Sequence, residues 1–189
     1  MKKLNQNKFA CLLPGILSLV WSARLSAQPA YKTNVELQCL RSTHGNNFRG
    51  TSVAVDKSIS VPLSIGLGIE YTYTPTHLDN GWNLSNLNFL PVYAEERWQF
   101  KPLNATHAFV HFSEGISFMR YDKSIPDSNV PKHTLHESGF YGYAGLGLLW
   151  KLGRRNHLLT ELGIKSFKIT TNNLDVNPHG LTFRMGLAI

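Results

Sequence analysis

Residues 63–74, Leu-Ser-Ile-Gly-Leu-Gly-Ile-Glu-Tyr-Thr-Tyr-Thr, decide the fold. Every odd-numbered position in this stretch is apolar or aromatic, and every even-numbered position is small or polar. A period of two places alternate side chains on opposite faces of a β-strand, whereas a helix would scatter the apolar residues around its circumference. The length also suits a tilted strand that crosses a bilayer. The stretch therefore predicts a membrane-spanning strand with one lipid-facing side.

The N-terminal segment has the layout of a secretory signal peptide. Three lysines precede an apolar stretch at 9–21, and small residues follow up to Ala27. The apolar stretch is shorter than the roughly 20 residues that a spanning helix needs. We therefore predict a cleaved signal peptide at 1–27 and a single outer-membrane β-barrel domain at 28–189.

The composition of the mature part excludes several classes of function. The full chain has a net charge of +7, but four of its basic residues lie before Gln28, which leaves 15 basic against 12 acidic residues. Only Cys39 remains after Ala27, so an intramolecular disulfide and a cysteine metal site are excluded. With no basic cluster and no nucleic-acid motif, we expect no nucleic-acid partner, no cofactor and no metal. After residue 27 no apolar run approaches 18 residues, so only strands can span a membrane.

The same alternation recurs along the chain between segments rich in turn residues. The expected strands are 31–40, 51–55, 63–74, 87–100, 108–121, 139–152, 158–165 and 181–189. The connections 41–50, 75–86, 122–138 and 171–179 are longer than those between them. Long loops at one end and short turns at the other are typical of bacterial outer-membrane barrels and place both termini in the periplasm. The predicted fold class is all-β, an eight-stranded antiparallel up-and-down transmembrane β-barrel.

Two of the expected strands have an imperfect pattern. In 87–100, Pro91 removes a ladder donor and three charged residues follow one another at 95–97, so we expect a bulge near Pro91. In 108–121, Glu114 shares the phase of the apolar residues. The sequence does not decide whether these charged residues face the lumen or the outside of the barrel.

A soluble secreted ligand-binding β-barrel is an alternative, since its strands also alternate, with the apolar face turned inward. The face opposite the apolar one is rich in glycine, which suits a crowded lumen better than a solvated surface. These glycines are Gly66, Gly68, Gly145, Gly147, Gly163 and Gly186. Aromatic residues also gather near strand ends, as in the interfacial girdles of membrane barrels. Both features favour the membrane barrel.

The strand phase assigns two sets of residues. We expect a lumenal polar network that fills the barrel, because the lumen of eight strands is too narrow for a channel. Its predicted members are Glu36, Glu70, Glu161, Lys165 and Arg184. The predicted lipid-facing residues are Leu63, Ile65, Leu67, Ile69, Phe183, Met185 and Leu187. Glu70 would lie near the outer end of the lumen and needs a cationic or hydrogen-bonding partner.

Three segments resemble the small outer-membrane β-barrel proteins of Bacteroidetes-type bacteria. They are the signal peptide ending Ser-Ala-Gln, the Asn-Phe-Leu-Pro-Val-Tyr stretch at 88–93, and the C-terminal segment 176–189. The last strand also resembles the signal read by the barrel assembly machinery, although Ile189 stands where an aromatic residue is usual. The resemblance implies a location in the outer membrane among its lipids and lipopolysaccharide, and says little about activity. We therefore predict a structural, adhesion or binding role for the extracellular loops, without catalysis and with the extracellular ligand left open.

The segment His111-Phe112-Ser113-Glu114 supports an enzymatic alternative. Residues i and i+2 of a strand share a face, so His111 is placed to act as a base for Ser113. The pair resembles the His-x-Ser motif of outer-membrane lipid A deacylases, in which the serine is usually followed by Asn rather than by glutamate. No partner acid is identifiable from the sequence. A deacylase-like esterase therefore stands beside the simpler interpretation that both residues are polar lumenal side chains.

Overall fold

The computed structural model describes residues 31–43, 45–79, 82–101, 106–124, 132–153, 156–169 and 178–189. The predicted signal peptide at 1–27 and its cleavage site lie outside the described residues. Within this part of the chain, no helix is long and apolar enough to cross a membrane.

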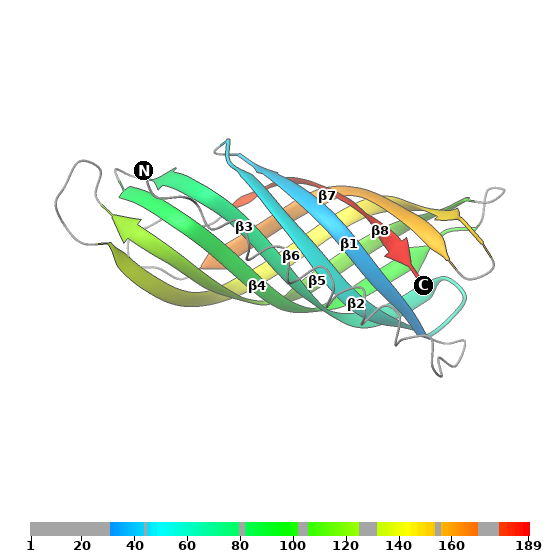
Figure 1. Ribbon diagram of the computed structural model, residues 1–189. Coiled ribbons are helices and arrows are strands. Elements are labelled where there is room, and N and C mark those ends of the chain that lie inside the picture. The colour runs from blue at the N-terminus through cyan, green and yellow to red at the C-terminus, as the bar shows by residue number, and fades with distance from the viewer. Residues whose placement is uncertain are drawn as a thin grey trace. The chain divides into compact units, whose positions relative to one another are not determined.

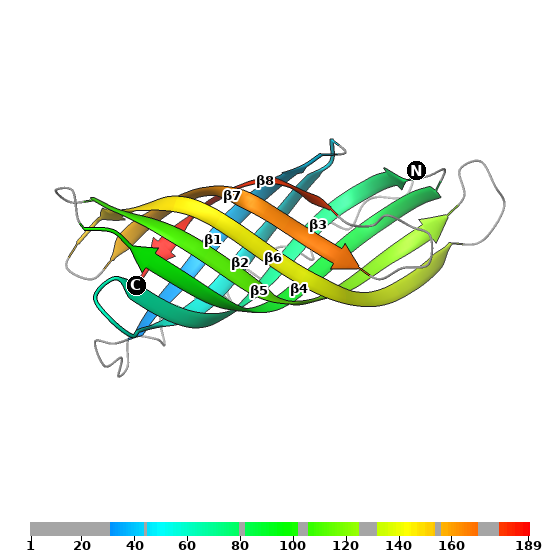
Figure 2. The same ribbon diagram turned by 180° about the vertical axis from the view of Figure 1, so that it is seen from behind.

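The described residues form one closed barrel of eight antiparallel strands (Figures 1 and 2). The strands are β1 (Tyr31–Ser42), β2 (Asn47–Ser58), β3 (Leu63–Asp79), β4 (Trp82–Gln99), β5 (Thr106–Ser124), β6 (His133–Lys151), β7 (His157–Ile169) and β8 (His179–Ala188). Each strand pairs with its neighbour in sequence, and β8 closes the barrel by pairing with β1. The predicted fold class is confirmed.

The apolar and polar residues that alternate in the sequence lie on opposite sides of the barrel wall. In β3, Ile65, Leu67 and Ile69 are 43%, 71% and 47% exposed, while Ser64 and Glu70 are buried. The apolar side chains thus face outward and form a belt around the barrel. A soluble barrel would bury them, so an apolar belt of this extent points to contact with a membrane.

The predicted loops at one end are wrong in extent. We call this end the upper end; it carries the β3–β4 and β5–β6 hairpins and lies to the left in Figure 1. The segments 41–50 and 75–86 are largely strand, because β2 begins at Asn47, β3 continues to Asp79 and β4 begins at Trp82. Their polar composition reflects strands that extend beyond the apolar belt into water. The prediction of long loops at one end and short turns at the other is therefore wrong for these two hairpins. At the upper end it is the strands that are long.

The predicted bulge near Pro91 is also wrong. Pro91 lies opposite Ser117, and its neighbours keep the same register with β5. The irregularity lies nearer the start of β4, between Ser85 and Asn88, where Asn86 has a φ of 56°. The outward phase therefore continues unbroken past Pro91, which places Glu95 and Arg97 inside the barrel and Glu96 outside.

The lumen is filled in layers. Toward the upper end lies a cluster of buried apolar and aromatic side chains: Leu40, Phe48, Leu84, Leu87, Phe89, Tyr93, Met119, Tyr121, Tyr141, Tyr143 and Phe167. At the lower end, where β1 begins and β8 ends, Phe109, Leu149, Leu159 and Ala188 form a second cluster. We call these clusters the upper and lower plugs. Buried charged residues occupy the space between them, so the barrel is a packed solid and not a channel.

Candidate functional site

The buried charged residues of the lumen are the candidate site. In the described part of the chain they are five acidic and four basic residues: Glu36, Asp56, Glu70, Glu95, Glu161, Arg97, His111, Lys165 and Arg184. They come from seven of the eight strands, β6 being the exception. A buried charge is tolerated only when it is paired and hydrogen-bonded, so the network has to be judged by its contacts.

Two arginines hold Glu36 at the centre of the network. The Arg97 Nη2 atom lies 2.6 Å from Glu36 Oε1, and the Arg184 Nε atom lies 2.7 Å from Glu36 Oε2. Arg97 also lies 3.3 Å from Glu95 and 3.8 Å from Asp56, and Asp56 accepts a hydrogen bond from the Asn34 amide. One guanidinium therefore links carboxylates from three strands across the lumen.

Lys165 and Glu70 form a second unit above this centre. The Lys165 Nζ atom donates to both carboxylate oxygens of Glu70 at 2.8 Å, and also to the side-chain oxygen of Gln38. The Tyr141 hydroxyl donates to Glu70 at 3.0 Å and the Thr72 hydroxyl at 2.6 Å. The structure thus places beside Glu70 both a cation and two hydroxyl donors.

A third unit links Ser113, His111 and Glu161. The Ser113 Oγ atom lies 2.8 Å from His111 Nε2, and His111 Nδ1 lies 2.8 Å from Glu161 Oε1. These are the contacts of a nucleophile, a base and an orienting acid. Glu95 Oε2 lies 3.4 Å from the same Nε2 atom.

The position of this third unit is unsuited to hydrolysis of an acyl ester. His111 is fully buried, Glu161 is 2% exposed and Ser113 is 5% exposed, with the plugs above and below. The backbone around Ser113 pairs with β4 on one side and with β6 on the other, so its N–H groups are committed to the two ladders. The ladders therefore leave no free backbone N–H group beside Ser113 that could bind a developing oxyanion.

Aromatic rings support the cations of the network. The Arg184 guanidinium carbon lies 4.7 Å from the centroid of the Tyr143 ring, and Arg97 lies 5.6 Å from that of Phe109. Lys165 lies 5.7 Å from the Tyr141 centroid. Each ring face adds an attraction for the buried cation that carboxylates alone do not supply.

The lumen contains all five residues that the strand phase assigned to it, and it contains further charges that the sequence analysis missed. The missed members are Asp56, Glu95 and Arg97. Asp56 continues the inward alternation of Ser52 and Ala54, a signal that could have found it. His111 and Ser113 also lie in the lumen, and their acid, Glu161, comes from β7.

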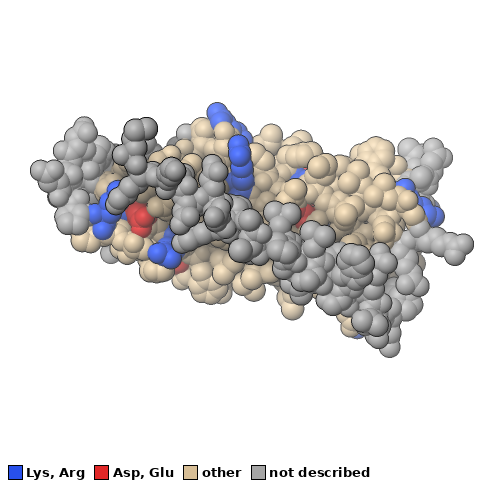
Figure 3. Space-filling view, viewed as in Figure 1, with Lys and Arg blue, Asp and Glu red and all other residues tan. Residues whose placement is uncertain are grey.

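The outward side chains form the apolar belt that faces away from this network. Phe183, Met185 and Leu187 of β8 are between 43% and 49% exposed, and Leu63 at the start of β3 is half-buried. On the face shown in Figure 3, charged side chains are sparse over the middle and lie mainly toward the ends and over the β1–β2 hairpin.

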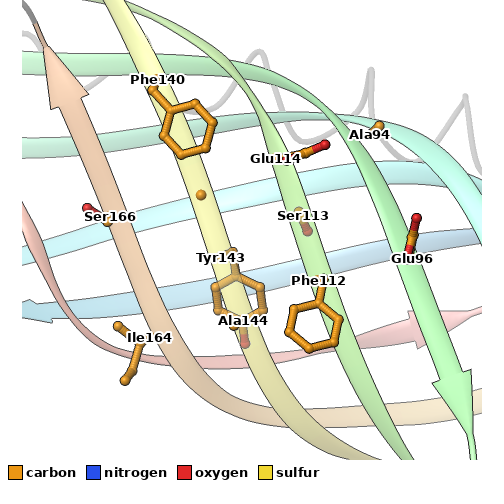
Figure 4. A pocket seen from close by; sticks show the side chains of 11 residues that line it. Ala94, Glu96, Phe112, Ser113, Glu114, Phe140, Tyr143, Ala144, Ile164 and Ser166 are labelled. Atoms are coloured by element: carbon orange, nitrogen blue, oxygen red, sulfur yellow. The ribbon is translucent and has the colours of Figure 1, made fainter.

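A hollow interrupts the belt over β4 to β7 (Figure 4). Its volume is about 620 Å³, and Phe112, Phe140 and Ile164 project around it. Ser113 and Tyr143 border it from behind the strands, and their side chains belong to the lumen. In the described part of the chain, no group of three or more His, Cys, Asp or Glu residues is arranged to hold a metal ion.

The fold is similar to those of solved outer-membrane barrels. A major outer membrane protein from Thermus thermophilus superposes with a TM-score of 0.61 at 14% identity, covering 84% of this chain and 98% of that one. Neisserial surface protein A superposes with a TM-score of 0.55 at 7% identity, covering 84% and 94%. The outer membrane enzyme PagL has a TM-score of 0.49 at 14% identity over 82% and 98%, a likeness too remote to bear on function.

No family model matches the chain, and no curated protein matches its sequence. At the identities found, the solved structures establish the fold alone. The chain therefore has the fold of the small outer-membrane β-barrels, and its activity has to be argued from its own residues.

Proposed function

We propose that the protein is a bacterial outer-membrane β-barrel with a structural, adhesion or binding role, exerted through the upper end, and without catalysis. One observation carries this proposal: a packed lumen lies inside an exposed apolar belt. The lumen offers neither a channel nor an accessible reaction site, and the belt suits only a lipid environment. The surfaces left for function are the hairpins that extend beyond the belt.

The extended hairpins support a binding role because they are held rigidly. The Asp122 carboxylate on β5 accepts hydrogen bonds from Asn86 on β4 at 2.9 Å and from Thr134 on β6 at 2.7 Å. The Tyr71 hydroxyl on β3 donates to Asn88 on β4 at 2.5 Å. Cross-strand links of this kind preorganise a surface, which lowers the entropy cost of binding a partner.

The proposed orientation places the upper end outside the cell and both termini in the periplasm, after export through the signal peptide at 1–27. The barrel strands β1 and β8 begin and end at the lower end, as periplasmic termini require. Exposed, outward-facing basic residues lie toward the upper end of the belt: Arg41, Arg49, Arg120 and Lys168. Side chains of this charge and position suit the phosphate groups of lipopolysaccharide in the outer leaflet.

Two narrower proposals concern assembly and source. The C-terminal strand β8 would be read by the barrel assembly machinery, and its outward residues Phe183, Met185 and Leu187 supply the alternating apolar face that such a signal needs. The short sequence motifs at 88–93 and 176–189 support an origin in a Bacteroidetes-type bacterium.

Cysteine labelling of intact cells tests the orientation. In a Cys39→Ser background, Thr76→Cys at the upper end is expected to react with a membrane-impermeant maleimide in intact cells. Ser60→Cys, exposed on the β2–β3 turn at the lower end, is expected to react only after the outer membrane is disrupted. The same samples, run unheated and boiled on an electrophoresis gel, should show the mobility shift of a folded barrel.

Either of two results would refute the proposed location. One is recovery of the protein in the soluble fraction without a heat-dependent shift. The other is labelling of Ser60→Cys but not of Thr76→Cys in intact cells, which would reverse the orientation.

The lipid A deacylase-like esterase is the second candidate, because the Ser113–His111–Glu161 contacts have the arrangement of a triad. The burial of all three residues leads us to expect no catalysis. Lipid A from cells that carry the wild-type protein, Ser113→Ala or no protein should have the same acyl-chain masses. Lipid A that lacks an acyl chain in cells with the wild-type protein, but keeps it in cells with Ser113→Ala, would establish the enzyme instead.

A further inference from the structure

Two glutamates stand on the outer face of the apolar belt. Glu96 on β4 and Glu114 on β5 are both exposed and outward-facing. Along β5, Glu114 lies between Phe112 and Ile116, which are 54% and 56% exposed. Trp98 on β4 and Phe100, just beyond the end of this strand, follow Glu96 toward the lower end of the belt. Both carboxylates therefore lie within the belt and not at its edges.

The register between β4 and β5 places the two carboxylates close together. Glu96 lies opposite Phe112, and Glu114 lies opposite Ala94, which precedes Glu96 by two residues on β4. Such diagonal neighbours on one face of an antiparallel pair have Cα atoms roughly 7–8 Å apart, within reach of long side chains. The described residues include no hydrogen-bond or ion-pair partner for either carboxylate.

Both carboxylates border the hollow over β4 to β7, as Figure 4 shows. Its lining includes four small residues, Ala94, Gly142, Ala144 and Ser166. Small residues on a membrane-facing surface allow the backbone of a second segment to approach closely. The hollow thus combines room for a packed partner with two negative groups beside it.

An unpartnered pair of carboxylates in lipid is costly. A charged residue on the lipid face of a barrel is destabilising, most of all near mid-depth. Two adjacent carboxylates add mutual repulsion. Ionisable residues at such positions are a sign of a functional contact, and the complementary group is a cation.

The position of the carboxylates limits which cation can meet them. A lipid headgroup lies at the membrane interface and not within the hydrocarbon belt. A second copy of this chain is poorly matched, because its described outward-facing basic residues lie toward the ends of the barrel, such as Arg120 above and Lys57 below. The remaining source is another membrane-embedded protein.

We propose that the hollow over β4 to β7 binds a membrane-embedded segment of another protein that carries a lysine or arginine side chain at the depth of Glu96 and Glu114. The small residues allow close packing, and the two carboxylates pair with the cation. This inference rests on the proposed membrane location and adds a lateral partner to the binding role of the upper end.

The test uses single-span probe peptides of leucine and alanine with one central lysine or, for comparison, a central leucine. Protein purified from membranes is incorporated into phosphatidylcholine vesicles, and association is measured by energy transfer between labels. The central-lysine peptide should bind at least about tenfold more tightly than the central-leucine peptide. The Glu96→Gln/Glu114→Gln double variant should lose this preference, and Gly142→Leu, which fills the hollow, should weaken binding of both peptides.

A matched control introduces two glutamines elsewhere on the apolar belt. Val55→Gln/Leu67→Gln changes two residues that lie opposite each other on β2 and β3, and it should keep the lysine preference. Equal binding of both peptides to the wild type would overturn the proposal, as would unchanged tight binding to Gly142→Leu.

Two further results would assign the hollow to a different occupant and would also overturn the proposal. One is self-association of the wild type that disappears in the double glutamine variant. The other is a lysine preference that added phosphatidylethanolamine abolishes, because the lipid amine then occupies the site. The heat-dependent mobility shift is recorded first, because it shows whether the barrel has folded in the vesicles. A folded barrel that does not prefer the lysine peptide refutes this inference and leaves the proposed membrane location intact.

Discussion

Replacing Arg97 by methionine is expected to lower the free energy of unfolding by about 3–5 kcal/mol. The guanidinium lies 2.6 Å from Glu36, 3.3 Å from Glu95 and 3.8 Å from Asp56, and all four residues are buried. Methionine fills much of the volume but leaves three carboxylates facing one another in a water-poor lumen. Urea unfolding in phosphatidylcholine vesicles, followed by tryptophan fluorescence, measures the loss.

Arg120→Met is the matched control, because Arg120 is an exposed, outward-facing arginine on β5. A surface substitution of this kind should change stability by no more than about 0.5 kcal/mol. The triple variant Arg97→Met/Asp56→Asn/Glu95→Gln should regain part of the loss, because it neutralises the two other carboxylates that contact Arg97 while Glu36 keeps its ion pair with Arg184. Equal effects of Arg97→Met and Arg120→Met would show that the network does not depend on Arg97.

The fold could be predicted because one physical rule acts on every strand. The wall of the barrel separates an apolar outside from a packed inside, so alternation in 63–74 and its counterparts reports the side directly. The lumenal positions of Glu36, Glu70, Glu161, Lys165 and Arg184 follow from the same rule. Strand ends could not be predicted as well, since the polar hairpins above the belt remain strands, although their composition is that of loops.

The site could be predicted only in part, for two reasons. Glu95 and Arg97 were missed because Glu96 lies between them and faces the other side, so three consecutive charges hide the phase. The contact between His111 and Glu161 joins β5 to β7, which are not neighbours in the sheet. Such contacts across the lumen depend on the curvature of the closed barrel, which local sequence patterns do not encode.

Replacing Gly115 by alanine is expected to destabilise the barrel by about 1–3 kcal/mol. A Cβ atom there would lie 2.1 Å from the Val92 carbonyl oxygen and 2.6 Å from the Tyr93 Cα atom. Gly115 lies opposite Tyr93 on one side and Tyr141 on the other, and the two rings pack with their centroids 5.3 Å apart. Because strands β4 and β6 are separated by β5, their rings can meet only over a residue without a side chain.

The control for this prediction is Gly153→Ala, where a Cβ atom would meet nothing within 4 Å. Both variants add one methyl group and remove the same backbone freedom from the unfolded chain, so their difference isolates the crowding at Gly115. Urea unfolding should therefore show a loss for Gly115→Ala and little change for Gly153→Ala. Equal stabilities would mean that Tyr93 and the β4 backbone shift without cost, and that the lumen is less tightly packed than its buried rings indicate.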